Sequence, residues 1–230
     1  MTLDLSALHE NMIVSKADST ATIRLYPRIL ETFEECVLQH GGVLHNVWMD
    51  QAIAVWIGKP SHYGPVMVQT AIHCVQRLKH LKKISIGSAN FQVHVGLTAG
   101  EVTKGVFGDD EFKTVQLFGP AIGKGMTVAK VNDTHGTSVT CDANIRSSVE
   151  HKFHTKPIEL LQDSSVVYEV IIGSARREDD IETRLATYRR AFDLYSQRYY
   201  REALKAFRGY TKQYGYDRSV ERIQSIMTGE

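Results

Sequence analysis

Residues 116–130 read QLFGPAIGKGMTVAK, and the interpretation of the whole chain depends on this stretch. Its pattern predicts a strand that ends at Phe118, a Gly119-Pro120 turn, and a helix that runs to about Val131. A glycine-rich turn between a strand and a helix is also where nucleotide phosphates commonly bind. The first question is therefore whether this turn is a phosphate-binding loop.

The spacing of the glycines argues against such a loop. A Walker A loop has the pattern GxxxxGK followed by Ser or Thr, whose hydroxyl binds the magnesium ion. Here Gly119 lies only four positions before Gly123, and Gly125 stands where that hydroxyl belongs. We therefore interpret Lys124 as a lysine on a helix surface and Gly119 as a glycine that the backbone turn requires.

The segments on either side alternate between helical and strand patterns. Apolar spacing predicts helices over 21–39 and 65–81, the first interrupted by Pro27 and ended by Gly41-Gly42. Strands are predicted over 43–57, as a pair around a turn at Asp50, and then over 91–97, 102–107, 112–118, 138–141 and 166–172. Residues 1–173 are therefore predicted to form one domain of mixed helices and strands.

The character of the sequence changes after residue 173. Residues 174–180 are polar and charged, which predicts a boundary, and 184–227 are helical throughout. Two amphipathic helices that meet near 197–199, and a third after Asp217, predict a helical tail over 181–230 that is similar to one tetratricopeptide unit. One such unit cannot bury its own apolar face, so we expect the tail to pack on the main domain or on a protein partner. The aromatic side chains predicted to form its core, or a partner-binding face, are Tyr188, Tyr195, Tyr199, Tyr200 and Phe207.

Composition excludes several classes of function. The 230 residues carry a formal net charge of +1, which removes the electrostatic basis for binding nucleic acid. No apolar run is long enough to cross a membrane, and the first residues lack the pattern of a signal peptide. Cys36, Cys74 and Cys141 are widely spaced, which predicts buried or idle thiols in a reducing compartment. We therefore expect a cytoplasmic protein.

Several segments, in order, resemble the catalytic domain of the class III nucleotidyl cyclases, the adenylyl and guanylyl cyclases. The segments HGG (40–42) and NVWMD (46–50) match the family's HGG and KxIGD, and VGLTAGEV (95–102) is similar to its GIHTGEV. Gly105 and Gly108 match the following GxxG, and LFGPAIG (117–123) lies over VIGDAVN without a gap. The similarity spans residues 1–172. Each motif is weak alone, whereas their order and spacing are specific.

The resemblance implies a fold and a chemistry. The fold is an α+β sandwich of ferredoxin-like type, with a mostly antiparallel sheet and helices packed against it, here followed by the helical hairpin. In the family, two aspartates bind two metal ions that activate the ribose 3′-hydroxyl and hold the triphosphate. A Lys and an Asp read the base, an Asn orients the ribose, and an Arg stabilises the transferred phosphate. The site forms between two domains packed head to tail, so the resemblance implies a homodimer or heterodimer.

Matches to the metal-binding aspartates are present. Asp50 lies at the second metal position, although Met49 replaces the preceding Gly and Asp is also a favoured turn residue. For the first position we favour Asp4 over Asp18, which fits a helix N-cap better. Mg²⁺ or Mn²⁺ is the expected cofactor if Asp4 and Asp50 bind metal. With Asp4 in that place, we expect the chain to begin partway through its first strand, as a fragment of a longer protein.

The other half of the site is degenerate. Asn46 and Thr114 stand at the positions of the base-reading Lys and Asp, and Gly123 and Thr127 at those of the ribose Asn and the phosphate Arg. Pro120 replaces a further Asp, and the late triphosphate lysine has no match in 160–163. Losing one such donor costs about 3 kcal/mol of barrier. Losing them together predicts a homodimer without a competent site, and no cofactor is expected other than the metal that Asp4 and Asp50 would bind.

Three functions follow from these alternatives. The first is a pseudo-cyclase, a domain without catalytic activity that acts as a dimerisation, regulatory or scaffold module in cyclic-nucleotide signalling. The second is the metal-bearing half of a heterodimeric cyclase. The third is a helical-repeat adaptor, with the tail as the surface that binds a protein partner. We favour the first because Met49, Pro120 and Gly123 alter the loops around the site.

Overall fold

The computed structural model describes residues 1–229 except 15, 85–91, 110 and 174–177, and for 11–14, 16–22, 82–84 and 178–180 it describes the backbone alone. The strands are β1 (Thr2–Asp4), β2 (Val43–Val47), β3 (Gln51–Val55), β4 (His94–Leu97), β5 (Thr103–Gly108), β6 (Lys113–Phe118), β7 (Val139–Cys141), β8 (Thr155–Leu160) and β9 (Val166–Val170). The helices are α1 (Ser6–Val14), α2 (Lys16–Gln39), α3 (Pro60–Ile84), α4 (Pro120–His135), α5 (Ala143–Val149), α6 (Glu178–Ser196), α7 (Tyr200–Tyr214) and α8 (Arg218–Thr228).

One sheet organises the main domain. Its strands lie in the order β2-β3-β1-β4-β7-β9-β8, and among the described pairs β4 and β7 run parallel while the others are antiparallel. Successive side chains of a strand point to opposite faces. In β4, Val95 and Leu97 therefore join the core beneath α2 and α3, whereas Gly96 faces α4. The mixed α+β sheet confirms the predicted fold class.

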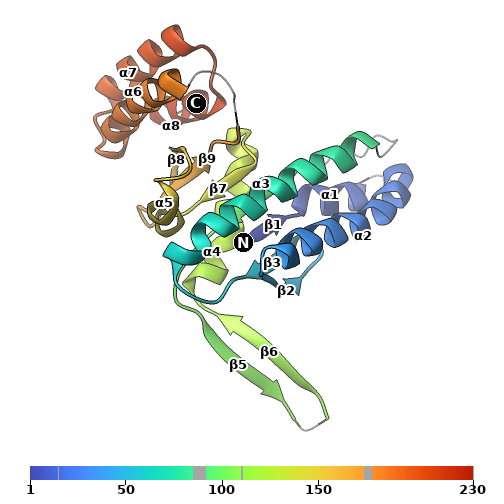
Figure 1. Ribbon diagram of the computed structural model, residues 1–230. Coiled ribbons are helices and arrows are strands. Elements are labelled where there is room, and N and C mark those ends of the chain that lie inside the picture. Colours follow the sequence, from blue (N-terminus) through green and yellow to red (C-terminus); the bar gives the residue numbers. More distant parts are fainter. Residues whose placement is uncertain (15, 85–91, 110, 174–177, 230) are drawn as a thin grey trace.

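Helices cover both faces of this sheet (Figure 1). On one face α2 and α3 pack side by side, with α1 against α2 and α5 against α3. Ile29, Phe33 and Val37 of α2 recur every fourth residue and are fully buried there, as helical spacing requires. On the other face α4 packs across β1, β4 and β7. The main core thus lies between the sheet and α2–α3.

The stretch 116–130 has the predicted strand–turn–helix form. β6 ends at Phe118, and α4 begins at Pro120. Gly119 has a φ of 154°, and a Cβ there would lie 2.3 Å from the Glu101 carbonyl oxygen. A glycine is required for both reasons. Gly136, in the left-handed conformation, ends α4 as its C-cap.

β5 and β6 form a separate two-stranded sheet that projects from the body of the molecule. Figure 1 shows this arm, residues 103–118, extending away from the end that carries the tail. The sequence predicted both strands. It did not indicate that they lie outside the main sheet.

The tail packs on the main domain, which is one of the two alternatives expected for an apolar face that cannot bury itself. Tyr188, Phe207 and Tyr210 form the centre of its core, and Leu160 and Val166 from β8 and β9 pack against it. At this junction the buried Lys156 of β8 lies 3.0 Å from Glu169 and 3.0 Å from Asp217. The predicted boundary at 174–180 falls partly on 174–177, which lie outside the described residues.

Several elements differ from the prediction. α2 runs unbroken through Pro27, which is exposed, so the carbonyl that loses its partner lies on the solvent side while the buried stripe continues. The sequence did not predict β8, which contains Pro157, because a proline argues against a strand. β8 lies at the edge of the sheet, however, where Pro is tolerated. The helices α1 and α5 were also missed, and both are short.

Within the part of the chain that the structure describes, no helix is both long enough and apolar enough to span a membrane.

Candidate functional site

The fold brings the two predicted metal aspartates to one end of the sheet. Asp4 is the last residue of β1 and pairs with Gln51 of β3, whose neighbour is Asp50. The Leu5 amide donates a 2.7 Å hydrogen bond to the Asp50 carbonyl oxygen. The two aspartates therefore occupy adjacent backbone positions. Asp18, the alternative, lies in the first turn of α2 instead of at its N-cap, and its side chain is outside the description.

The carboxylate of Asp4 is buried and already bonded. One of its oxygens accepts hydrogen bonds from the backbone amide and the hydroxyl of Ser6. The other lies 3.9 Å from Nδ1 of His94, which is equally buried. Burial lowers the pKa of His94 and outweighs the opposing attraction of Asp4, so this imidazole is neutral at pH 7. Asp4 thus serves the turn between β1 and α1.

The four positions predicted to be degenerate lie on three different elements. The side-chain oxygen of Asn46, in β2, accepts a 2.9 Å hydrogen bond from the Val47 amide. Thr114 lies in the arm, paired with Phe107. Gly123 and Thr127 are one helical turn apart on the exposed side of α4, and a Cβ at Gly123 would meet no atom within 4 Å. The backbone would accommodate a larger residue there, so steric crowding does not explain the glycine.

Lys124 is more than a solvated surface lysine. Its ammonium lies 2.8 Å from Asp163 and donates a 2.9 Å hydrogen bond to the Ser165 hydroxyl. Both partners belong to the turn between β8 and β9. Lys124 therefore ties α4 to this turn.

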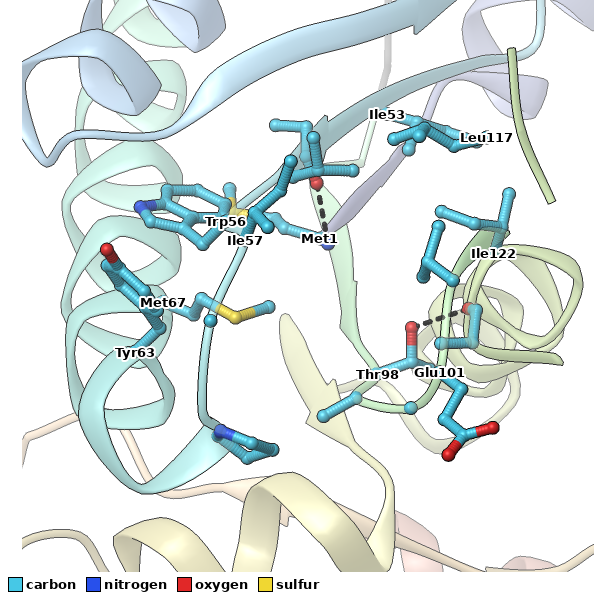
Figure 2. A pocket seen from close by; sticks show the side chains of 18 of the residues that line it. Met1, Ile53, Trp56, Ile57, Tyr63, Met67, Thr98, Glu101, Leu117 and Ile122 are labelled. Carbon is cyan, nitrogen blue, oxygen red and sulfur yellow. Dashed lines mark hydrogen bonds between the residues drawn. The ribbon is translucent and has the colours of Figure 1, made fainter. Parts of the chain in front are cut away.

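A cavity of about 900 Å³ opens at the other end of the sheet, beyond the end of β3 and the start of α4 (Figure 2). Apolar side chains dominate its wall, among them Met1, Ile53, Trp56, Met67 and Ile122. Thr98 is held in place because its hydroxyl donates a 2.8 Å hydrogen bond to the Ala121 carbonyl oxygen. None of the six predicted site residues lines this cavity.

Sequence reasoning missed the cavity. Trp56, Ile57 and Tyr63 span the end of one strand and the start of a helix, and they carry no spacing that predicts a shared wall. Figure 2 shows Glu101 at the cavity's margin, with its carboxylate directed away from the apolar side chains. The cavity is therefore suited to apolar packing, and its described wall contains no paired nucleophile and base.

Comparison with known proteins identifies the fold. No protein-family model and no curated protein sequence matches the chain. Among solved structures, a bacterial light-regulated adenylyl cyclase matches with a TM-score of 0.61 and 16% identity, over 76% of this chain and 52% of that one. The adenylyl cyclase CyaB from P. aeruginosa matches with a TM-score of 0.63 and 14% identity, over 76% of this chain and 93% of that one. The chain has the fold of a class III cyclase catalytic domain.

A third match supports the same conclusion. The guanylate cyclase domain of RhGC from Catenaria anguillulae, solved with GTP, has a TM-score of 0.56 and 18% identity, over 75% of this chain and 94% of that one. The present chain spans about half the length of the light-regulated cyclase but nearly all of the two others. The match is thus to the catalytic domain rather than to a larger assembly.

The resemblance to class III cyclases implies a pair of metal ions, and the described residues supply only part of the ligand set for such a pair. Among the described residues, no three His, Cys, Asp or Glu side chains cluster as metal ligands. Asp4 and Asp50 supply two carboxylates, and hydrogen bonds within the protein already engage Asp4. A hard cation such as Mg²⁺ needs several free oxygen ligands in octahedral array. Metal binding at Asp4 and Asp50 therefore stays a prediction.

Proposed function

We propose that this cyclase-fold domain is a pseudo-cyclase, which pairs with a second domain and acts in the cytoplasm as a regulatory or scaffold module instead of as an enzyme. The observation that carries the proposal is the apolar surface of the arm. Absence of the acceptor residues at Asn46, Thr114, Gly123 and Thr127 supports the loss of catalysis.

Both faces of the arm carry exposed apolar side chains. Residues directly opposite in an antiparallel pair share a face. Val106 faces Val115, with 60% and 48% of their surfaces exposed. On the other face the rings of Phe107 and Phe118 pack edge to face, with their centroids 5.6 Å apart, and about half of each side chain is exposed. Phe112, at the tip, is 72% exposed.

This surface requires a partner. A two-stranded hairpin is marginally stable by itself in water. Contiguous exposed apolar side chains mark interaction sites in soluble proteins. We therefore assign the arm to contact with a second cyclase-fold domain, in the first instance another copy of this chain. Burying the arm would stabilise both the hairpin and the pair.

The pairing is tested by light scattering during size-exclusion chromatography. The wild-type chain should elute as a dimer at micromolar concentration, and the double variant Val106→Lys/Phe112→Lys as a monomer. Ile226→Lys, at an exposed apolar residue on α8, is the matched control and should leave the dimer unchanged. A wild-type chain that stays monomeric throughout, or an arm variant that remains dimeric, would remove the support for this proposal.

The loss of catalysis is tested separately. The purified chain with Mn²⁺ and either ATP or GTP should form no cyclic nucleotide above the buffer background. Turnover that disappears in Asp50→Ala would overturn the pseudo-cyclase proposal. The pairing proposal would survive that result, because it rests on the arm.

A second candidate, the metal-bearing half of a heterodimeric cyclase, is favoured by the adjacent positions of Asp4 and Asp50. It predicts that activity appears on mixing with a cyclase domain that retains the Lys, Asn and Arg missing here. It also predicts that Asp50→Ala removes this activity while Asp193→Ala, at an exposed aspartate of α6, does not. A mixture without gain counts against this candidate.

A further inference from the structure

Two of the three cysteines meet where α2 packs on α3. Cys36 and Cys74 are free thiols with no exposed surface. Arg77, three residues beyond Cys74 on α3, reaches the Cys36 sulfur, and a side-chain hydrogen bond between the two thiols lowers the pKa of Cys36 and raises that of Cys74. Sulfur atoms in hydrogen-bond contact are a short movement from the separation of about 2.0 Å in a disulfide.

The guanidinium of Arg77 lies beside the Cys36 sulfur. Arg77, one helical turn beyond Cys74, directs Nη1 at the Cys36 sulfur from 3.8 Å. Its Nη2 forms a 2.6 Å ion pair with Glu35. About a third of the Arg77 side chain is exposed, so Cys36 lies directly beneath a polar surface pair rather than deep in the apolar core. Movement of one side chain would admit a small oxidant.

The two thiols differ in acidity. The hydrogen bond from Cys74 lowers the pKa of Cys36 to about 7, with a further contribution from Arg77, and together they outweigh burial. The pKa of Cys74 is raised well above its ordinary value, because it donates that hydrogen bond and is buried. The groups that face Cys36 are Cys74 and Arg77 on α3, Glu35 on α2, and His40 just beyond the end of α2. Near neutral pH, a substantial fraction of Cys36 is therefore thiolate while Cys74 is a thiol, as in a nucleophilic and resolving pair.

We propose that Cys36 and Cys74 are a peroxide-sensitive pair that forms a reversible disulfide between α2 and α3. The Cys36 thiolate attacks one oxygen of hydrogen peroxide, the O–O bond breaks, and the departing hydroxide takes a proton to become water. Cys36 is then a sulfenic acid. The Cys74 sulfur next attacks the Cys36 sulfur, the S–O bond breaks, and the hydroxide leaves with the Cys74 proton as a second water. Two thiols lose two electrons, and one peroxide is reduced to two waters.

The disulfide would join two helices of the main core. It would fix how α2 and α3 pack on the sheet, on the side opposite α4. This inference rests on residues away from the arm, so it stands or falls independently of the proposed pairing.

The experiment treats the reduced full-length chain with hydrogen peroxide at pH 7 and follows its intact mass. The mass should fall by two hydrogen atoms, digestion without reductant should yield one peptide pair that joins Cys36 to Cys74, and dithiothreitol should reverse both changes. In Cys74→Ser the reaction should stop at a sulfenic acid on Cys36, which dimedone traps. Cys141→Ser is the matched control and should oxidise like the wild type, because burial raises the pKa of Cys141 and keeps it a thiol.

Arg77→Met should slow the oxidation at pH 7 by about twofold or more, because it removes the guanidinium that helps to lower the pKa of Cys36 while the larger contribution from Cys74 remains. Arg77→Lys should recover most of the rate. Circular dichroism shows whether each variant is folded. A folded wild-type chain in which no Cys36–Cys74 peptide forms, or forms only after addition of urea, would overturn the proposal. Equal rates for Cys141 and Cys36 would overturn it as well.

Discussion

Asp217 lies where the tail packs against the sheet. Its carboxylate connects the tail to β8. It caps α8 by accepting a 3.0 Å hydrogen bond from the Ser219 amide, and it also pairs with Lys156. Burial opposes ionisation of Asp217, but the Lys156 ammonium and these hydrogen bonds prevail and hold its pKa below the usual value. Burial likewise opposes the charge on Lys156, which Glu169 and Asp217 outweigh, so its pKa is raised.

This pair predicts a specific dependence of stability on pH. A carboxyl group with a lowered folded pKa stabilises the fold above its unfolded pKa of about 3.9, and the contribution is lost as the pH falls through the folded value. Asp217→Asn keeps the cap but removes the charge, and should lower the free energy of unfolding at pH 7 by about 3 kcal/mol. The difference from the wild type should shrink as the pH falls below about 4 in urea titrations. Asp193→Asn, at an exposed position on α6, is the control, and a deficit for Asp217→Asn that stays constant with pH would contradict the role of charge.

At the scale of elements, α4 can lie on the sheet because glycines replace side chains between them. A Cβ on Gly96 would lie 2.6 Å from the Ala129 amide nitrogen and 2.7 Å from the Gly125 carbonyl oxygen. Both atoms belong to the helix backbone and cannot move without the whole helix. At Gly123, on the exposed side of the same helix, a Cβ would meet nothing.

Two alanine substitutions should therefore have opposite effects. Gly96→Ala should lower the free energy of unfolding by about 3 kcal/mol, because overpacking must displace α4. Gly123→Ala should raise it by about 0.5 kcal/mol or more, because alanine favours the helix and meets no obstacle. Urea unfolding followed by circular dichroism measures both. A destabilised Gly123→Ala would mean that this position is constrained by something other than helix geometry.

At the scale of the molecule, the chain is a cyclase-fold body with an exposed arm at one end and a docked helical tail at the other (Figure 1). The tail's buried aromatic residues pack on each other and on β8 and β9, whereas Tyr199 and Tyr200 stay exposed. The apolar face that an adaptor would offer to a partner is thus largely used within the chain.

Removal of the tail should therefore damage the body. A chain of residues 1–173 leaves Lys156 without Asp217 and exposes Leu160 and Val166, so its free energy of unfolding should fall by at least about 3 kcal/mol. Denaturant titration of this chain against the full one measures the loss. Arg201→Ala, on the exposed side of α7, is the control, and it should leave the free energy of unfolding unchanged. A truncated chain with unchanged stability would instead favour an independent tail and the adaptor function.

Local patterns in the sequence determined most of the elements and the order of the motifs, since periodicity and turn residues act over a few neighbours. They indicated β2 and β3 around Asp50, the strand–turn–helix at Gly119, and the three helices of the tail. They failed at β8, where an edge position makes Pro157 acceptable, and at α2, where an exposed Pro27 leaves the buried stripe intact. The prediction that Asn46, Thr114, Gly123 and Thr127 replace cyclase site residues also came from the sequence, because it depends only on which amino acid stands at each position.

Only the tertiary structure decided which apolar surfaces are exposed and which distant side chains are in contact. The alternation in β5 and β6 is the same whether a strand joins a sheet or projects from it, so only the fold reveals the arm's exposed apolar faces. Contacts between residues far apart in the chain, such as Cys36 with Cys74 or Lys156 with Asp217, leave no spacing signal. The elements follow from neighbouring residues, whereas burial and pairing depend on how distant parts of the chain pack together.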